Sequence, residues 1–589
     1  MARAVSLALL GLALVAVPIV VALVGFVGDR WTLTGDWASL DVRIAEVGTR
    51  DTPLIGAYST RGWAHPGPSI YRLAAPARWA SGGDPRSMMW TAGAINLASI
   101  GAIAWVARRR GGDAMALVAL LACALLAHGL GPGRVIDLWN PIVPLFPLLL
   151  VAFLAWSAAT GERRHAVPAL LVGALVAQAH VSMVALLAVI GAWAVAWTVL
   201  ERRGHPPDDE VDGDVEAEGA DDRRPGWVPV LAAGGGLAAL AFVPPLVDQV
   251  ARTGNLGTLA RYFVAGGNQP VGLGTGLGLV SRYVRPDGPW LGGPEPTHGV
   301  SVLGSGALPT LAILVALAAM AIALWRRGWR TDAAGASLAL VLVAAAVPIA
   351  SRVDRPIFDY LVKWLEVPSA FAWFWLAWGT WRLLVRPATV ARGLPRPALA
   401  GVGVVAIALV AAWSVPAATR LHFPAAQREA KAVAALVPEL AATLPHDRPV
   451  RIEHRGDDFG NVASGIIVGL RRSGVDVVTT DGWTGLKYGP DAVWKPGEPA
   501  VSPVLTVAVD YPYRLRSTRR RCLDEGARPV AEYDQLTAEQ RRWLTDMSAK
   551  ALFEPELVTP AEQRRADRLG PRAFAVTVFE ADDVCATGP

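Results

Sequence analysis

Long apolar runs separated by polar connections dominate the first two thirds of the chain. Each run is about 17–25 residues long, the length an α-helix needs to cross the hydrocarbon core of a bilayer. A single helix over 166–200 would place arginine clusters on both sides of the membrane, so we predict a hairpin that turns near His180. The pattern therefore predicts eleven transmembrane helices, at 4–26, 90–107, 114–131, 142–160, 166–183, 184–200, 228–246, 307–325, 333–350, 364–385 and 398–414.

Basic residues in the connections predict the orientation. Lys and Arg near the ends of spans stay in the cytoplasm, and the clusters occupy alternate connections. The first run resembles a signal peptide, but it is longer than a typical apolar signal region and no clear cleavage pattern follows, so we take it as the first span. We expect a multi-pass protein of the cytoplasmic (inner) membrane with its N-terminus in the cytoplasm. The clusters are Arg3, Arg108–Arg110, Arg163–Arg164, Arg202–Arg203 with Arg223–Arg224, Arg326–Arg330 and Arg386–Arg396.

The fold class predicted is an α-helical polytopic membrane protein with a C-terminal extracytoplasmic α/β domain. Residues 1–415 form the transmembrane domain, whose large outer loops are 27–89 and 247–306, and residues 416–589 form the second domain. We interpret the acidic tract 206–226 as a disordered linker and the glycine-rich 272–279 as a flexible loop. The tail alternates expected strands and helices, with strands at 448–454, 475–480, 504–510 and 572–580 and helices at 424–443, 461–473 and 537–552.

Composition agrees with a membrane protein, because 53% of the residues are hydrophobic and the mean hydropathy is positive. The net charge of +5 follows from the arginine-rich connections, so we expect no nucleic-acid partner. Cys123 lies in an apolar span. Cys522 and Cys585 both fall in the exported tail, where an oxidising exterior would let them pair, and we predict a disulfide between them. No Walker loop or HExxH motif is present.

Two aspartates follow the first span, in "GDWASLD" (35–41). We predict a short helix at 37–47 with Asp36 as its N-cap. Asp41 then falls at the edge of an apolar stripe, where it either forms a buried salt bridge or acts as a general base at the membrane surface. The stripe consists of Trp37, Leu40, Ile44 and Val47.

Cations and aromatic side chains gather in the predicted outer loops, on the side that the positive-inside bias depletes. An anionic lipid phosphate would explain them, and ordinary headgroup contacts are the alternative. Arg61 and His65 lie among tyrosines and tryptophans in 54–73, and His180 lies at the hairpin turn. The other candidates for binding a donor phosphate or sugar are Arg261, Tyr262, Arg282, Arg352, Arg355 and Lys363.

Five strings resemble the polytopic glycosyltransferases of the GT-C fold class. This class takes a sugar from a polyprenyl-phosphate carrier at the outer leaflet and has an acidic motif in its first outer loop. The resemblance covers about residues 1–415, and the motif here is D-x4-D instead of an adjacent acidic pair, which leaves either aspartate as the base. The strings are "GDWASLD" (35–41), "STRGWAHPGP" (59–68), "LWNPIVPLFP" (138–147), "VAQAHVSM" (176–183) and "DQVARTGNL" (248–256).

The resemblance implies an SN2-like displacement at the anomeric carbon, with inversion. Asp36 or Asp41 would accept the proton of the acceptor hydroxyl, while outer-loop cations with His65 or His180 stabilise the departing lipid phosphate. It implies no required cofactor or metal, although some members of the class bind a divalent cation. The implied partners are a polyprenyl-phosphate-linked sugar donor, an envelope glycan or glycolipid acceptor, and membrane lipids.

Two other functions are compatible with a polytopic chain. A transporter or lipid flippase would have ionisable residues or Gly/Pro breaks near the middle of its spans, whereas these spans are nearly free of charge. A non-catalytic envelope scaffold would not need a carboxylate on the packed side of 37–47. The Arg-, Ala-, Gly- and Val-rich composition is typical of a high-GC genome, in which an arabinofuranosyltransferase or mannosyltransferase of cell wall biogenesis would fit.

Overall fold

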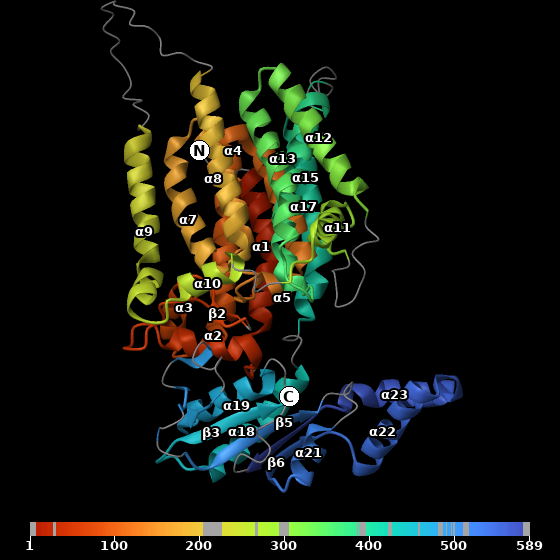
Figure 1. Ribbon diagram of the computed structural model, residues 1–589. Helices are drawn as coiled ribbons and strands as arrows, with labels where there is room; N and C mark the ends of the chain where they lie inside the picture. Colours follow the sequence, from red (N-terminus) through yellow and green to blue (C-terminus); the bar gives the residue numbers. More distant parts are fainter. Residues whose placement is uncertain are drawn as a thin grey trace, which may run out of the picture.

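The computed structural model has a helical body at one end and a sheet domain at the other (Figure 1). The acidic tract 206–225, Asp457, Asp458 and Cys585 lie outside the described part of the chain. The described residues are 7–27, 31–59, 61–203, 226–264, 269–293, 306–385, 387, 396–421, 427–456, 460–480, 487–489, 492–495, 498, 501–510 and 517–580.

Each of the predicted apolar runs falls on a helix of the body. Within the described ranges, seven helices are long and apolar enough to cross a membrane, judged by length and composition. One of them, α4, contains two predicted runs joined at Gly112, whose φ of +71° breaks the helix. The helices that carry the predicted runs, whether or not they are among these seven, are α1 (Leu7–Gly25), α4 (Ser87–Leu130), α6 (Leu145–Ala159), α7 (Ala166–Ala179), α8 (Ser182–Arg203), α9 (Trp227–Ala251), α12 (Leu308–Arg326), α13 (Arg330–Ala350), α15 (Glu366–Thr380) and α17 (Arg396–Thr419).

The hairpin predicted near His180 is confirmed, because α7 ends at Ala179 and α8 begins at Ser182. The flexible loop predicted at 272–279 is wrong, since these residues lie in helix α11 (Leu273–Val284). Its buried residues Leu279, Val280, Tyr283 and Val284 form one face, and α11 packs on α13. A Cβ at Gly276 would lie 2.8 Å from the carbonyl oxygen of Val347, so the glycines permit close helix packing where the sequence suggested a loop.

Short helices cover the end of the body that faces the sheet domain. In Figure 1, α2, α3, α10 and β2 lie between the helical body and the sheet. Strands β1 and β2 pair antiparallel, with Ser59 opposite Trp63. These elements are α2 (Gly35–Ala45), β1 (Tyr58–Ser59), β2 (Trp63–Ala64), α3 (Ser69–Ala80), α5 (Pro132–Val135), α10 (Asn255–Val264) and α14 (Asp359–Val362).

The tail is an α/β domain, as predicted, with a five-stranded sheet in the order β4-β3-β5-β7-β6. Strand β3 runs parallel to β4 and β5, and β7 runs antiparallel to β5 and β6. The sequence prediction missed β6, an edge strand that carries Pro529 at a register shift, where proline is tolerated. The elements are β3 (Val450–Arg455), β4 (Val477–Val478), β5 (Val504–Asp510), β6 (Arg528–Asp534), β7 (Ala575–Glu580), α18 (Gln427–Thr443), α19 (Asn461–Arg472), α21 (Thr518–Asp524), α22 (Ala538–Phe553) and α23 (Pro560–Leu569).

The tail domain shares one hydrophobic core with the short helices α2 and α3. Leu40 and Ile44 of α2 and Ile70 of α3 belong to the same buried cluster as Val433 of α18 and Ile466 of α19. A separate, larger cluster fills the helical body. Because apolar burial is the main stabilising term in packing, the tail is docked on α2 and α3 and is not merely tethered to the helical body.

Candidate active site

Helix α2 carries both aspartates of the acidic motif, and it begins earlier than predicted. Its N-cap is Thr34, and Asp36 lies in the first turn, so the predicted capping role of Asp36 is wrong. Gly35 opens the helix at a φ of +53°, a conformation that favours glycine. This early start frees the carboxylate of Asp36 for contacts with other segments.

The carboxylate of Asp36 is fixed by two donors from distant parts of the sequence. The hydroxyl of Tyr58 donates to Oδ1 over 2.7 Å, and the indole Nε1 of Trp139 donates to Oδ2 over 2.9 Å. Burial and the neighbouring Asp36 raise the pKa of Tyr58 well above its usual value, which keeps its proton in place as a donor. Each carboxylate oxygen can still accept a further hydrogen bond.

Asp36 faces a small cavity that could receive a substrate hydroxyl. The cavity is small, about 20 Å³, and it lies between α2, the loop after it, α3 and the tail domain; a space of this size admits a water-sized group such as a hydroxyl. Its wall is mostly polar or aromatic, and one lining residue is cationic. The lining residues are Asp36, Ser39, Leu40, Ala57, Tyr58, Tyr71, Asn140 and Lys487.

A second carboxylate, Asp137, supports this wall. It accepts hydrogen bonds from Nε1 of Trp37 at 2.9 Å and from the backbone N–H of Trp139 at 2.9 Å. The two segments are therefore linked reciprocally. Trp37 donates its indole proton to Asp137, and Trp139 donates its indole proton to Asp36. Burial raises the pKa of Asp137 to about 6, against the opposing effect of these hydrogen bonds.

Asp41 has a different environment, between two arginines. It is 2% exposed and forms ion pairs with Arg78 of α3 and, at 2.5 Å, with Arg472 of α19 in the tail domain. Desolvation by burial nevertheless raises the pKa of Asp41, although both arginines act to lower it. Of the two roles left open for Asp41, the contacts correspond to the buried salt bridge.

The two histidines named as site candidates, His65 and His180, lie side by side, with ring centroids 4.3 Å apart. The backbone N–H of Val181 donates to Nδ1 of His65 over 3.2 Å, which requires that nitrogen to be unprotonated. Burial, and then the neighbouring His180, lowers the pKa of His65 well below its usual value. A neutral His65 can orient a group by hydrogen bonding but does not supply a positive charge.

Arg61, Tyr262 and Arg355 come together around Asp354. The hydroxyl of Tyr262 donates to Asp354, and Nε of Arg61 lies 4.0 Å from the same carboxylate. Arg61 also donates to the carbonyl oxygen of Arg355 over 3.2 Å. Trp63 links this group to the histidines, with its ring centroid 5.8 Å from Tyr262 and 5.4 Å from His65.

The other predicted cations are dispersed. Lys363 is 1% exposed and pairs with Glu366 at 3.0 Å, so its ammonium points into the helical body and not toward the surface. Arg261 and Arg352 are exposed and Arg282 is half-buried. In the tail, Cys522 is disulfide-bonded, and Cys123 is a free, buried thiol.

Several site residues were missed by the sequence interpretation. Asp137, Trp139 and Asn140 adjoin or lie within the quoted "LWNP" string, which gave a signal for the segment but not for the contacts. Tyr360 packs on Trp139 at 5.2 Å, and burial, followed by Asp36, raises its pKa to about 12. Lys487 had no sequence signal, since it lies far away in the tail domain.

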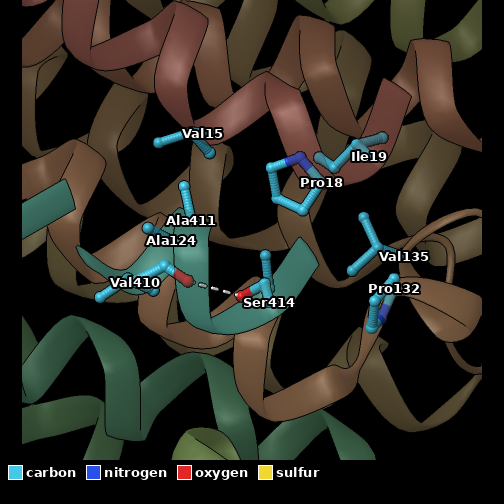
Figure 2. Close-up of a pocket in the computed structure, with 10 residues that line it drawn as sticks. Val15, Pro18, Ile19, Ala124, Pro132, Val135, Val410, Ala411 and Ser414 are labelled. Carbon is cyan, nitrogen blue, oxygen red and sulfur yellow. Dashed lines mark hydrogen bonds between the residues drawn. The ribbon is translucent and has the colours of Figure 1, made fainter. Parts of the chain in front are cut away.

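A second cavity lies within the helical body, between α1, α4 and α17 (Figure 2). Its wall is apolar apart from Ser414, whose hydroxyl donates to the carbonyl oxygen of Val410 over 2.8 Å. None of its lining residues is titratable. Throughout the described ranges, no group of three or more His, Cys, Asp or Glu side chains is arranged to hold a metal ion.

Comparison with known proteins identifies the fold. No protein-family model matches the sequence, and a search of curated proteins finds no match. The chain is similar to ArnT from Cupriavidus metallidurans bound to undecaprenyl phosphate, with a TM-score of 0.54 and 15% identity over 98% of both chains. ArnT from the same source in the apo state matches with a TM-score of 0.49 and 15% identity, over 88% of this chain and 95% of that one. The chain therefore has a GT-C fold, as the motifs implied.

Proposed function

We propose that this chain is a membrane glycosyltransferase that transfers a sugar from a polyprenyl-phosphate donor to an envelope glycan or glycolipid. The observation that carries the proposal is the carboxylate of Asp36, which is fixed by Tyr58 and Trp139 and faces a small, mostly polar cavity. Support also comes from the fold, since the similar ArnT structure contains undecaprenyl phosphate. The composition favours arabinofuranose or mannose as the sugar.

In the proposed reaction, Asp36 acts as the general base. An acceptor hydroxyl in the cavity donates its proton to the carboxylate as its oxygen bonds to the anomeric carbon. The bond from that carbon to the phosphate oxygen breaks, and the electron pair leaves with the lipid phosphate, so the anomeric configuration inverts. The reaction needs no metal if protein cations stabilise the leaving phosphate, and chelators are then expected to leave the rate unchanged.

Sugar transfer by purified Asp36→Asn and Asp41→Asn variants tests this assignment. With polyprenyl-phosphate arabinofuranose and mannose as donors, Asp36→Asn should reduce transfer by about 10²–10⁴-fold, the usual loss for a general base. Asp41→Asn is the matched control on the same helix, and it should retain most of the rate in the fraction that folds. A wild-type rate in the Asp36→Asn variant would show that Asp36 is not the base, and an absence of transfer by the wild-type protein would favour a transporter or scaffold function.

A further inference from the structure

The tail domain contributes a side chain to the Asp36 cavity. Lys487 lies in the tail sequence, yet it lines this cavity together with Asp36 and Tyr58. Its Nζ lies 4.6 Å from the ring centroid of Tyr58, and the hydroxyl of the same tyrosine donates to Asp36. One tyrosine therefore separates the proposed base from the cation.

Gly460, the N-cap residue of α19, lies close to Lys487. Gly460 has a φ of +62°, and a Cβ added there would lie 3.1 Å from Nζ of Lys487 and 3.5 Å from Nε2 of His454. The ammonium thus occupies the space that a side chain at this position would take. Lys487 is only 3% exposed, so its charge is directed at the cavity wall and not at bulk solvent.

The tail is held on α2 by contacts that fix this arrangement. Arg472 pairs with the buried Asp41. The backbone of α2 also approaches α19 closely, because a Cβ at Gly35 would lie 2.6 Å from Oδ1 of Asn461. Together with the shared hydrophobic core, these contacts hold the tail domain, and with it Lys487, at the cavity.

The charges of Asp36 and Lys487 indicate which kind of group this lysine would bind. An ionised Asp36 repels an incoming phosphate, and the repulsion is stronger in a partly closed cavity than in water. A cation on the same wall offsets it and adds charge-assisted hydrogen bonds. We propose that Lys487 of the tail domain binds the phosphate of the polyprenyl-phosphate donor, which makes the tail a part of the active site. This inference rests on the proposed function.

The test compares binding of undecaprenyl phosphate with binding of undecaprenol, which lacks the phosphate. The full chain in detergent is titrated with each lipid and the phosphate preference is taken as the ratio of the two affinities. Lys487→Gln should reduce this preference by about 10- to 100-fold, the loss typical of a hydrogen bond to a charged group. Lys487→Arg should stay within about threefold of wild type, and Lys431→Gln, an exposed change in the same domain, should have no effect.

The ratio of affinities distinguishes phosphate binding by Lys487 from a purely structural role. If Lys487 has a purely structural role, Lys487→Gln should lower the affinities for both lipids equally and leave their ratio unchanged, which would overturn the proposal. Wild-type affinities for both lipids in this variant would also overturn it. If Lys487→Gln does not fold, Lys487→Met replaces it, since it keeps much of the apolar stem and removes the charge. Lys487→Met should lose the phosphate preference in the same way, and a wild-type ratio in this variant would refute the site.

Failure of the proposed function has a different signature. A wild-type protein that prefers undecaprenyl phosphate through Lys487 but transfers no sugar would remove the transfer reaction and keep the phosphate site. If the wild-type protein transfers sugar and Lys487→Gln keeps the full phosphate preference, the transfer reaction stands and the phosphate site at Lys487 is refuted.

Discussion

Substituting Asp41 with Asn should destabilise the docked tail, because it removes the charge between Arg78 and Arg472. Breaking a buried ion pair costs about 3–5 kcal/mol. Two observations reduce this figure. The side chain of Arg472 is 39% exposed and can be solvated, and desolvation of the buried carboxylate, which raises the pKa of Asp41, opposes the attraction of the two arginines. We therefore expect a loss of about 2 kcal/mol.

The assay is thermal unfolding of the full chain in detergent, followed by tryptophan fluorescence. Asp41→Asn should lower Tm by several degrees, whereas Arg50→Gln should leave Tm unchanged, since Arg50 is 85% exposed in its pair with Asp51. Membrane proteins do not always unfold in two states, so the comparison rests on the order of the Tm values. An Asp41→Asn variant that melts with wild type would show that the Arg78 and Arg472 contacts do not hold the tail.

Three more predictions concern protonation and the tail. Because the pKa of His65 is held well below its usual 6.5, the unfolded chain binds a proton that the folded chain does not, so Tm should fall as pH drops below about 6.5, and His65→Gln should weaken that dependence. The pKa of Asp137 is raised to about 6, so its contribution is favourable at low pH and lost as pH rises through 6; Asp137→Asn should raise stability by up to about 3 kcal/mol at pH 8 and by little near pH 4. Non-reducing peptide mapping of protein from intact cells should recover Cys522 linked to Cys585, and free thiols at both positions would contradict the pairing.

The helical body was largely predictable because its cause is local. A run of apolar residues of membrane-spanning length has few alternatives to a helix, and the hairpin at His180 followed from the arginine distribution. The glycine-rich α11 could not be predicted in this way. Gly276 packs against the end of α13, and a contact with a helix so distant in the sequence leaves no signal in the local pattern.

The candidate site was predictable only in part, because its hydrogen bonds join distant segments. The acidic motif pointed to the correct helix, but Tyr58 and Trp139 reach Asp36 across 22 and 103 positions. Arg472 reaches Asp41 across 431 positions. No periodicity reports such contacts, so the sequence identified candidate carboxylates and the tertiary structure distinguished their environments.

The spacing of the motif explains why its two aspartates have different environments. Five residues along an α-helix rotate the side chain by about 140°, so Asp36 and Asp41 lie on different faces of α2. One face lines the cavity with Tyr58 and Lys487, and the other meets the arginines of α3 and α19. Two adjacent acidic residues would also point in different directions. They would not be separated along the helix by the additional turn that here lies between Asp36 at the cavity and Asp41 at the tail interface. The D-x4-D spacing thus allows one short helix to be both a wall of the candidate site and the surface on which the tail domain docks.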